Sequence, residues 1–557
     1  MRIVLSQIWR LAVICAWQPG GRFGIALFAV VFALGLVSVQ ITVRLIRWTN
    51  DFYNALQRVD VAEAINQIGV FFLLVAISAA LHLASAYLRK MLQIRWRKVL
   101  TDVMLGHWLA GKAYWHMRDR TEHGLDNPDQ RIADDCRIFV YRLTTEALEL
   151  ITNIVALVTY FAILWNLSTF PLSFQLFGVD ISIARYMVWA APIYVAISSG
   201  VTHWLGAPLV PLNVQQQKTE ADFRFALSRF RGAGEQVALI GGEAAERRLF
   251  QQRFEAIILN WRQLMNREFI LGCFTRPYMQ TVLRIPLFLA LPAFLAGRLT
   301  FGGLMQIGSA FQNVVTTLSW FIFSYRDLAE LASAAKRLDN FREAAVTASM
   351  TESGTTRGKG ASLRLGNVEL HQPDGRSILR IDGIDVAPGE TVWLRGRSGL
   401  GKTTLARTVA GIWPHGTGRI DYPPGHLVVL PQQAYLPIGS VADAAVYPAD
   451  AANLDHGDIA AALTLVGLTR LAAAASLDAD VSTLGLSGGE RQRLVLARLL
   501  IDRPDHVLLD EATSALDEEA EAAVLSALRR ELPDATFVII AHREPKGLGS
   551  VRTITLE

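Results

Sequence analysis

The chain has 557 residues, of which 52% are hydrophobic, and its mean hydropathy is positive. This length exceeds one ordinary domain, and the composition is too apolar for a wholly soluble protein, so a membrane part is expected. The formal net charge of +4 is small for the length and gives no indication of nucleic-acid binding. The three cysteines show no CxxC pair or metal-ligand spacing and are interpreted as packing residues.

Long apolar stretches before residue 325 indicate membrane spans, because crossing about 30 Å of hydrocarbon takes about 20 residues. One stretch is interrupted by Arg276 and Arg284. We expect Arg284 to face water or a carboxylate, unless it snorkels or the boundary lies a turn away. The sequence predicts six crossings, within residues 23–43, 64–88, 150–179, 186–217, 269–297 and 299–325.

Basic residues are distributed unevenly over the loops between these spans. Loop 89–149 holds eleven Lys or Arg and loop 208–268 holds nine, whereas the other loops are short and carry few. The positive-inside rule therefore places both long loops and both termini in the cytoplasm. Apolar residues recur at three- and four-residue spacing in both loops, which predicts helices. The first 21 residues carry Arg10 inside an apolar run and favour an interfacial elbow helix over a signal peptide.

The amino-acid composition of the chain changes after Phe341. Residues 345–362, AVTASMTESGTTRGKGAS, are small, polar and glycine-bearing, a composition typical of a linker. Beyond them, hydrophobic strands alternate with helical patterns. We therefore predict a polytopic α-helical membrane domain over 1–344, a linker over 345–362, and an α/β domain over 363–557.

A phosphate-binding loop opens a helix early in the α/β domain. The segment GRSGLGKTT follows the strand-like TVWLR and precedes the helical TLARTVAGIW. Its glycines allow backbone N–H groups to surround phosphate oxygens, Lys402 reaches the outer phosphates, and Thr403 can ligate magnesium. The predicted phosphate-binding residues are Gly396, Arg397, Ser398, Gly399, Leu400, Gly401, Lys402, Thr403 and Thr404.

The stretch HVLLDE, residues 506–511, supplies the acidic strand that such a loop requires. Its apolar run predicts a buried central strand that ends at Asp510, whose carboxylate is placed to hold the water shell of a magnesium ion. Glu511 follows and is placed to orient or deprotonate an attacking water. His506 is an odd residue at the first position of the strand. The two motifs together indicate a P-loop nucleoside triphosphatase and predict an α/β nucleotide-binding domain.

Four further motifs indicate which kind of P-loop nucleoside triphosphatase this domain resembles. The motifs LPQQ, LSGGERQR, SALD and IIAHR occur in this order, and the set resembles the ATP-binding cassette family over residues 363–557. The resemblance implies that the nucleotide is ATP, that two polar side chains sense its γ-phosphate, and that an aspartate couples two sites. These residues are Gln432 and His542 for the γ-phosphate, with Gln432 also near magnesium, and Asp517 for the coupling.

The resemblance also implies a dimer. Ser487, Gly488 and Gly489 are expected to close over ATP held by the P-loop of a second cassette, because a serine hydroxyl, glycine N–H groups and a helix N-terminus stabilise phosphate charge. One chain holds one cassette, so we expect a homodimer with two equivalent ATP sites that meet isologously. The expected catalytic residues are Glu511, His542 and Gln432, and the expected magnesium residues are Thr403, Gln432 and Asp510.

One position departs from the family pattern. Cassettes of this kind usually stack an aromatic ring on adenine from a VxFxY-like segment before the P-loop, whereas this chain has VELHQP with Gln372 in that slot. Either the selectivity for adenine is loosened, or His371 stacks instead. The choice of ATP over GTP therefore follows from the resemblance and not from a residue.

The membrane part carries motifs of its own. NPDQRIADD, at 127–135, has the pattern of a helix start with Asn127 as its cap. Together with segments at 220–243 and 302–311 and with the KRL at 336–338, it is similar to the SbmA/BacA-like membrane domain. Similar segments occur in subfamily D, the peroxisomal fatty-acyl transporters. The resemblance thus extends over most of the chain.

Bacterial members with a fused cassette resemble proteins for the uptake of cobalamin, bleomycin and antimicrobial peptides. This implies ATP-driven import of bulky hydrophilic solutes, small molecules or peptides, through the bilayer of the bacterial inner membrane. Acyl-CoA or lipid movement remains an alternative, and so does a membrane-anchored regulatory ATPase. A proton-driven carrier with an idle cassette is disfavoured because Lys402, Asp510, Glu511 and His542 are all present. The residues themselves specify neither the solute nor the direction.

Overall fold

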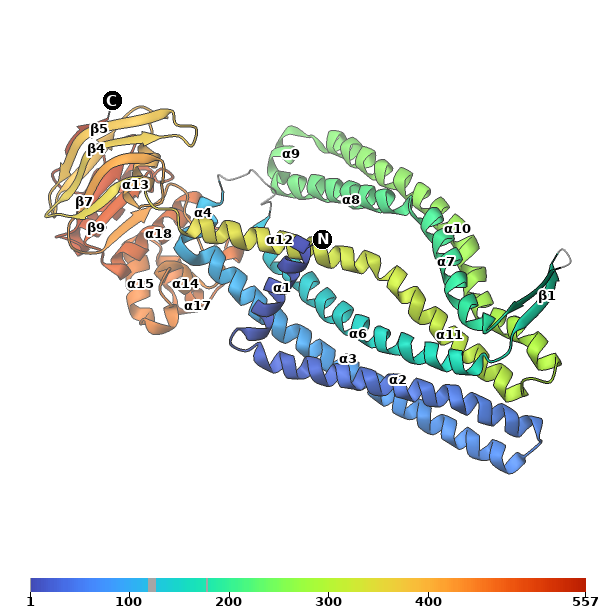
Figure 1. Ribbon diagram of the computed structural model, residues 1–557. Helices are drawn as coiled ribbons and strands as arrows, with labels where there is room; N and C mark the ends of the chain where they lie inside the picture. Colours follow the sequence, from blue (N-terminus) through green and yellow to red (C-terminus); the bar gives the residue numbers. More distant parts are fainter. Residues whose placement is uncertain (1, 119–126, 177–178, 557) are drawn as a thin grey trace. The chain divides into compact units, whose positions relative to one another are not determined.

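The structure, a computed structural model, describes residues 2–118, 127–176 and 179–556 (Figure 1). The described residues divide into two compact units. The helical unit is formed by residues within 1–105 and 127–342, and the α/β unit by residues within 106–118 and 343–556. The α/β unit therefore includes a short segment of the first long loop as well as the C-terminal part of the chain.

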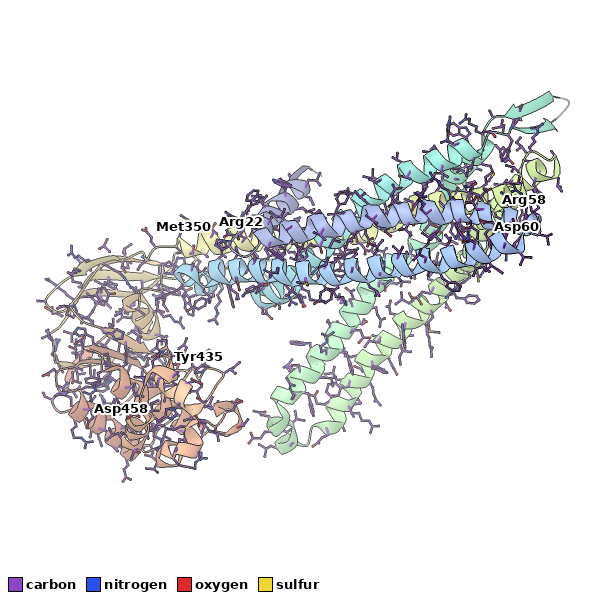
Figure 2. The ribbon with its side chains drawn as sticks, turned by 90° about the horizontal axis from the view of Figure 1, so that it is seen from below. Arg22, Arg58, Asp60, Met350, Tyr435 and Asp458 are labelled. Carbon is purple, nitrogen blue, oxygen red and sulfur yellow. The ribbon has the colours of Figure 1, made fainter. Side chains whose placement is uncertain are left out.

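Long helices dominate the helical unit, since apolar runs in a membrane must satisfy their backbone groups internally. In Figure 2, Arg22 at the start of α2 and the turn with Arg58 and Asp60 mark the two ends of one such helix. The helices are α1 (Arg2–Trp17), α2 (Arg22–Gln57), α3 (Val61–Leu109), α5 (Pro128–Gln130), η2 (Arg131–Asp135), α6 (Cys136–Leu167), α7 (Tyr186–Gly206), α8 (Leu209–Gly232), α9 (Gly234–Ile240), α10 (Glu243–Leu295), α11 (Phe301–Phe323) and α12 (Tyr325–Ser349).

Five helical segments among the described residues are long and apolar enough to cross a membrane, whereas the sequence predicts six crossings. The sixth predicted crossing, within residues 299–325, corresponds to α11, a helix of 23 residues without a charged side chain. Its Gln306, Gln312 and Asn313 lower its hydropathy, so its crossing stays a prediction. The five segments are Arg22–Gln57, Val61–His116, Pro128–Leu167, Tyr186–Gly232 and Glu243–Leu295.

The predicted span over 150–179 is longer than the helix that forms there. Helix α6 ends at Leu167, and the chain continues into the antiparallel strands β1 (Leu172–Leu176) and β2 (Val179–Ile183). Pro171 explains the interruption, because proline has no N–H to continue a helix. Residues 177 and 178 of that prediction lie outside the described residues.

The core of the helical unit is centred on α11. Ile307, Ala310, Phe311 and Val314 have no exposed surface, and their spacing of three and four residues places them on adjoining turns. Helix α11 packs against α2, α6, α7 and α10. The polar residues of α11 therefore lie on a helix that packs against four other helices of this unit.

Asp135 joins two of the sequence motifs of the membrane part. It lies in the π-helical turn η2, is 2% exposed, and accepts hydrogen bonds from Arg337 Nε at 2.9 Å and Arg337 Nη2 at 2.6 Å. Arg131 Nη1 donates to the same carboxylate at 2.8 Å. The NPDQRIADD and KRL segments, about two hundred residues apart, are thus held together by a buried ion-pair cluster between η2 and α12.

Replacing Asp135 with asparagine should destabilise the helical unit, because two guanidinium groups lose a buried anion. We expect the free energy of unfolding to fall by about 3 kcal/mol. Thermal unfolding of the purified protein in detergent measures the effect as a lower Tm. Asp134→Asn is the matched control, since Asp134 pairs with Arg137 at the surface and its loss should cost less than about 1 kcal/mol. Equal Tm values for the two variants would contradict the assignment.

The α/β unit contains two sheets. The five-stranded parallel sheet has the order β11-β6-β10-β9-β8, and the four-stranded sheet has the order β3-β7-β4-β5. The strands are β3 (Thr356–Lys359), β4 (Leu363–His371), β5 (Ser377–Val386), β6 (Thr391–Arg395), β7 (Gly416–Tyr422), β8 (Leu427–Leu430), β9 (His506–Asp510), β10 (Thr536–Ile540) and β11 (Arg552–Thr555).

Two hydrophobic clusters hold this unit together. One fills the space between the two sheets and α13 (Lys402–Val409), and Leu405 and Val409 of that helix belong to it. The other packs α14, α15, α18 and α19 against β9 and β10, and Figure 2 marks this part by Tyr435 and Asp458. The helical elements are η1 (Ala110–Lys112), α4 (Ala113–His116), α13 (Lys402–Val409), α14 (Val441–Val446), η3 (Ala451–Asn453), α15 (His456–Leu465), α16 (Thr469–Ala472), α17 (Ala474–Leu477), η4 (Val481–Thr483), α18 (Gly488–Asp502) and α19 (Glu518–Glu531).

The segment predicted as a linker is partly structured. Helix α12 continues to Ser349, and β3 pairs in parallel with β7. Residues 106–118, which the sequence places in the membrane domain, belong to the α/β unit. The domain boundaries at 344 and 362 stay predictions.

Candidate active site

The carboxyl ends of four neighbouring strands bring predicted site residues to one edge of the parallel sheet. Strands β6, β10, β9 and β8 are adjacent in this order. Strand β6 leads into the P-loop, β9 ends at Asp510, and β10 and β8 precede His542 and Gln432. Because parallel strands end at the same edge, residues more than a hundred positions apart meet there.

Lys402 lies inside the P-loop. Its side chain is largely buried, and its ammonium group donates to the carbonyl oxygens of Gly396 at 2.7 Å and Arg397 at 3.0 Å. Gly401 has φ +103°, and a Cβ there would lie 2.5 Å from Cγ2 of Ile378, so the turn into α13 requires glycine. The loop is therefore curved around a cation at the start of a helix, an arrangement that suits a polyphosphate.

Thr403 and Asp510 form an oxygen-donor pair beside the loop. Thr403 Oγ1 donates to Asp510 Oδ1 at 3.3 Å. Asp510 is 3% exposed, and burial raises the pKa of its carboxyl group, partly offset by the hydrogen bond from Thr403. Magnesium takes oxygen ligands and commonly uses one or two protein groups together with phosphates and water. A hydroxyl and one carboxylate fit that ion; when bound, it would neutralise phosphate charge.

Glu511 is held from both sides by the other predicted catalytic residues. Its Oε2 accepts from Gln432 Nε2 at 2.8 Å, and its Oε1 lies 3.1 Å from His542 Nε2. Its backbone has φ +49°, a left-handed conformation that costs a non-glycine residue about 1–3 kcal/mol. The N–H of Glu511 donates to the carbonyl of Ile540 at 2.9 Å, which helps to fix this conformation. The carboxylate thus has a defined position from which it could orient water.

Ser487 and Asp517 each cap a helix. Ser487 forms a capping box with Glu490 at the start of α18, and the N–H of Ser487 lowers the pKa of Glu490. Asp517 accepts from the N–H of Ala520 at 2.7 Å at the start of α19. These hydrogen bonds lie within each helix start. The roles of Ser487, Gly488, Gly489 and Asp517 toward a nucleotide therefore stay predictions.

The expected adenine-stacking position lies in a turn. The N–H of Gln372 donates to the carbonyl of Arg376 at 2.8 Å, and the carbonyl of His371 accepts from Trp413 Nε1 at 3.2 Å. Within the described part of the chain, Nδ1 of His371 is buried without a hydrogen-bond partner.

Trp115 is a site residue that the sequence reasoning missed. Its indole N–H donates to the carbonyl of Ile412 at 2.9 Å, and Arg407 of α13 stacks over its ring at 5.4 Å. Trp115 and Arg407 line a cavity of about 1250 Å³ together with Thr403 and Asp510. A segment of the first long loop therefore contacts the helix that follows the P-loop. The aromatic run HWLAGKAYWH was the available signal, but its partner could not be read from the sequence.

A P-loop, a buried acidic strand end and a glutamate held by glutamine and histidine define a nucleotide-hydrolysing cassette, here on the same chain as membrane-spanning helices. Residues 17–295 match the family described as ABC transporter transmembrane region 2, and residues 380–514 match the ABC transporter family. The chain belongs to the ABC transporters, as a half-transporter with one membrane region and one ATPase domain that couples ATP hydrolysis to transport.

Several known proteins are similar over most of their length. The Escherichia coli inner membrane ABC transporter ATP-binding protein YddA is 34% identical over 94% of this chain and 93% of its own. The human lysosomal cobalamin transporter ABCD4 is 27% identical over 85% of this chain and 81% of its own. A bacterial Atm1-family ABC exporter solved with ATP bound has a TM-score of 0.73 at 18% identity, covering 96% of this chain and 93% of that one, which shows the same fold.

The raised pKa of Asp510 predicts how acid affects the metal requirement. Its protonated form is favoured by burial, so the carboxylate needed for magnesium is lost at a higher pH than for an exposed aspartate, whose pKa is about 4. We expect the magnesium concentration for half-maximal ATPase activity to rise up to about tenfold per pH unit below that pKa. Magnesium titrations from about pH 7.5 down to about pH 4, where an exposed aspartate protonates, measure this. A requirement that rises only as the pH reaches the range of an exposed aspartate would contradict the prediction.

Proposed function

We propose that the chain forms a homodimeric importer of bulky hydrophilic solutes, cobalamin-like or peptide-like, in the bacterial inner membrane, with its nucleotide-binding domain and both termini in the cytoplasm. The hydrogen bond from Gln432 to Glu511 and the close contact of His542 with the same carboxylate carry the ATPase part of this proposal. The name of the ABCD4 relative supports a cobalamin-like solute, and that of YddA supports the inner membrane.

In this proposal each site residue has its own role in the binding and hydrolysis of ATP. Lys402 and the P-loop N–H groups bind the phosphates, Thr403 and Asp510 hold magnesium, and Glu511 activates water. Gln432 and His542 position Glu511 and respond to the γ-phosphate. The proposed partner is a second copy of the chain, whose Ser487, Gly488 and Gly489 close each ATP site, with Asp517 linking the sites.

The contact of Trp115 with α13 offers a route from the ATP site to the membrane helices. Trp115 lies in α4, which η1 separates from the end of α3 at Leu109, and Arg407 of the helix that begins at Lys402 stacks over its ring. A change at the P-loop that shifts α13 would therefore move the first long loop. We propose that ATP binding draws two cassettes together, that this movement reaches the spans through the long loops, and that hydrolysis resets them.

Solute uptake into sealed vesicles with defined orientation tests the proposed substrate. Labelled cobalamin, a labelled peptide and a labelled acyl-CoA are offered separately, with ATP on the cassette side. ATP-dependent movement of cobalamin or peptide toward the cassette side supports the proposal. Exclusive acyl-CoA movement favours the subfamily D alternative, and ATP hydrolysis without movement of any offered solute favours a regulatory ATPase. Uptake driven by a pH gradient without ATP would revive the proton-driven carrier.

A further inference from the structure

The side chain of Gln492 joins two motifs of the cassette. It lies on α18, is 7% exposed, and accepts at Oε1 a hydrogen bond from the N–H of Ala515 at 2.8 Å. Its Nε2 donates to Ser514 Oγ at 3.2 Å. Ser514 and Ala515 begin the SALD segment, which ends at Asp517. One amide group therefore fastens the helix that follows LSGG to the backbone of the neighbouring motif.

Close packing accompanies these hydrogen bonds. A Cβ at Gly489 would lie 3.2 Å from the carbonyl oxygen of Ala515 and 3.4 Å from a methyl group of Leu516. A Cβ at Gly488 would lie 3.5 Å from Cβ of Ala515. The first turn of α18 thus rests directly on the SALD segment. Gln492 itself is buried whereas Ser514 and Ala515 are exposed, so losing its amide would remove two hydrogen bonds that fasten an exposed loop segment to a buried helix side chain.

The SALD segment is also tied to the catalytic glutamate. The N–H of Ser514 donates to the carbonyl of Glu511 at 3.1 Å, and Thr513 Oγ1 donates to Glu521 of α19 at 2.5 Å. The chain between Glu511 and Asp517 is therefore held at three places: its start, Gln492 and α19. A displacement of α18 would reach Glu511 through Gln492 and Ser514.

We propose that Gln492 is a positioning residue that couples the two ATP sites of the dimer. In the dimer, Ser487–Gly489 bind the ATP held by the partner cassette. Through Gln492, a movement of these residues also moves the SALD segment and Glu511 of their own chain. Closure over the nucleotide at one ATP site then orders the catalytic glutamate at the other ATP site. This inference rests on the proposed homodimer and assigns Gln492 no contact with nucleotide or water.

Two variants of the full-length protein in lipid vesicles test the coupling. Gln492→Met keeps the size of the side chain and removes both hydrogen bonds. Gln492→Glu can still accept from the N–H of Ala515 and can accept from the Ser514 hydroxyl. We expect Gln492→Met to lower kcat about tenfold with little change in the affinity for ATP, and to reduce the Hill coefficient for ATP to about 1. Gln492→Glu should restore cooperativity and most of kcat.

The possible results distinguish a failure of the inference about Gln492 from a failure of the proposed function. A wild-type protein that hydrolyses ATP cooperatively, with a Gln492→Met variant of unchanged kcat and Hill coefficient, would overturn the inference alone. Loss of kcat with cooperativity retained, or equal loss in Gln492→Met and Gln492→Glu together with a lower Tm, would show a merely structural role and also overturn it. A wild-type protein with no ATPase activity would overturn both the proposed function and this inference.

Discussion

The Glu511→Gln variant is expected to hydrolyse ATP at least about a hundredfold more slowly than the wild type while still binding ATP. The carboxylate lies between Gln432 and His542, so the neutral amide keeps the shape of the site but cannot accept a proton from water. Slow hydrolysis should leave ATP bound between two cassettes. ATPase rates in vesicles and the ATP retained after gel filtration measure the two effects.

Glu519→Gln is the matched control for this variant. Glu519 is exposed in the first turn of α19, and its substitution should leave both the rate and the retained ATP unchanged. A Glu511→Gln protein that turns over ATP at the wild-type rate would contradict the assignment of the general base. Solute movement at the wild-type rate by the same variant would contradict coupling between hydrolysis and transport.

The Lys402→Met variant is expected to lose ATP affinity by about ten- to a hundredfold, with hydrolysis falling at least as much. Lys402 is buried inside the P-loop, where its charge would meet the phosphate oxygens of a bound nucleotide with little competition from bulk water. Its hydrogen bonds to Gly396 and Arg397 also hold the loop curved, so the variant loses preorganisation as well as charge. Equilibrium binding of a fluorescent ATP analogue measures the affinity.

Lys359→Met provides the control for this second variant, because Lys359 is exposed on β3. It removes the same charge from the same unit and should leave ATP affinity within about twofold of the wild type. If Lys402→Met bound the analogue as tightly as Lys359→Met, the P-loop lysine would have no special role, and the proposed phosphate site would be wrong.

The sequence predicted the P-loop and the acidic strand well because both are local patterns. A glycine-rich turn between a strand and a helix, and an apolar run ending in Asp510, depend on residues that are neighbours in the chain. The proximity of Gln432, Glu511 and His542 in the fold is not a local pattern of this kind. It depends on the strand order β8-β9-β10, and strand order is a tertiary property that spacing along the chain does not contain.

The features that sequence reasoning missed are contacts between distant polar groups. Asp135 and Arg337 were each part of a recognised motif, yet nothing in either motif indicates that they pair. Gln492 stands in a charged run that reads as a solvated helix face, but burial against the SALD segment gives it two internal hydrogen bonds. The span predicted within 150–179 is confirmed as far as Leu167, and the excess length arose because hydropathy recorded the apolar run and not the effect of Pro171.

The central claim is that each ATP site is completed by a second copy of the chain, and mixed dimers test it most directly. In a Glu511→Gln background, one copy carries Lys402→Met and the other Gly488→Asp. Each variant alone has two defective sites, whereas a mixed dimer keeps one site with an intact P-loop and an intact partner Ser487 segment. We expect mixed dimers, isolated with two affinity tags, to retain about one ATP per dimer, and either variant alone to retain almost none. Retention by the mixed dimers no higher than that of the separate variants would contradict the claim.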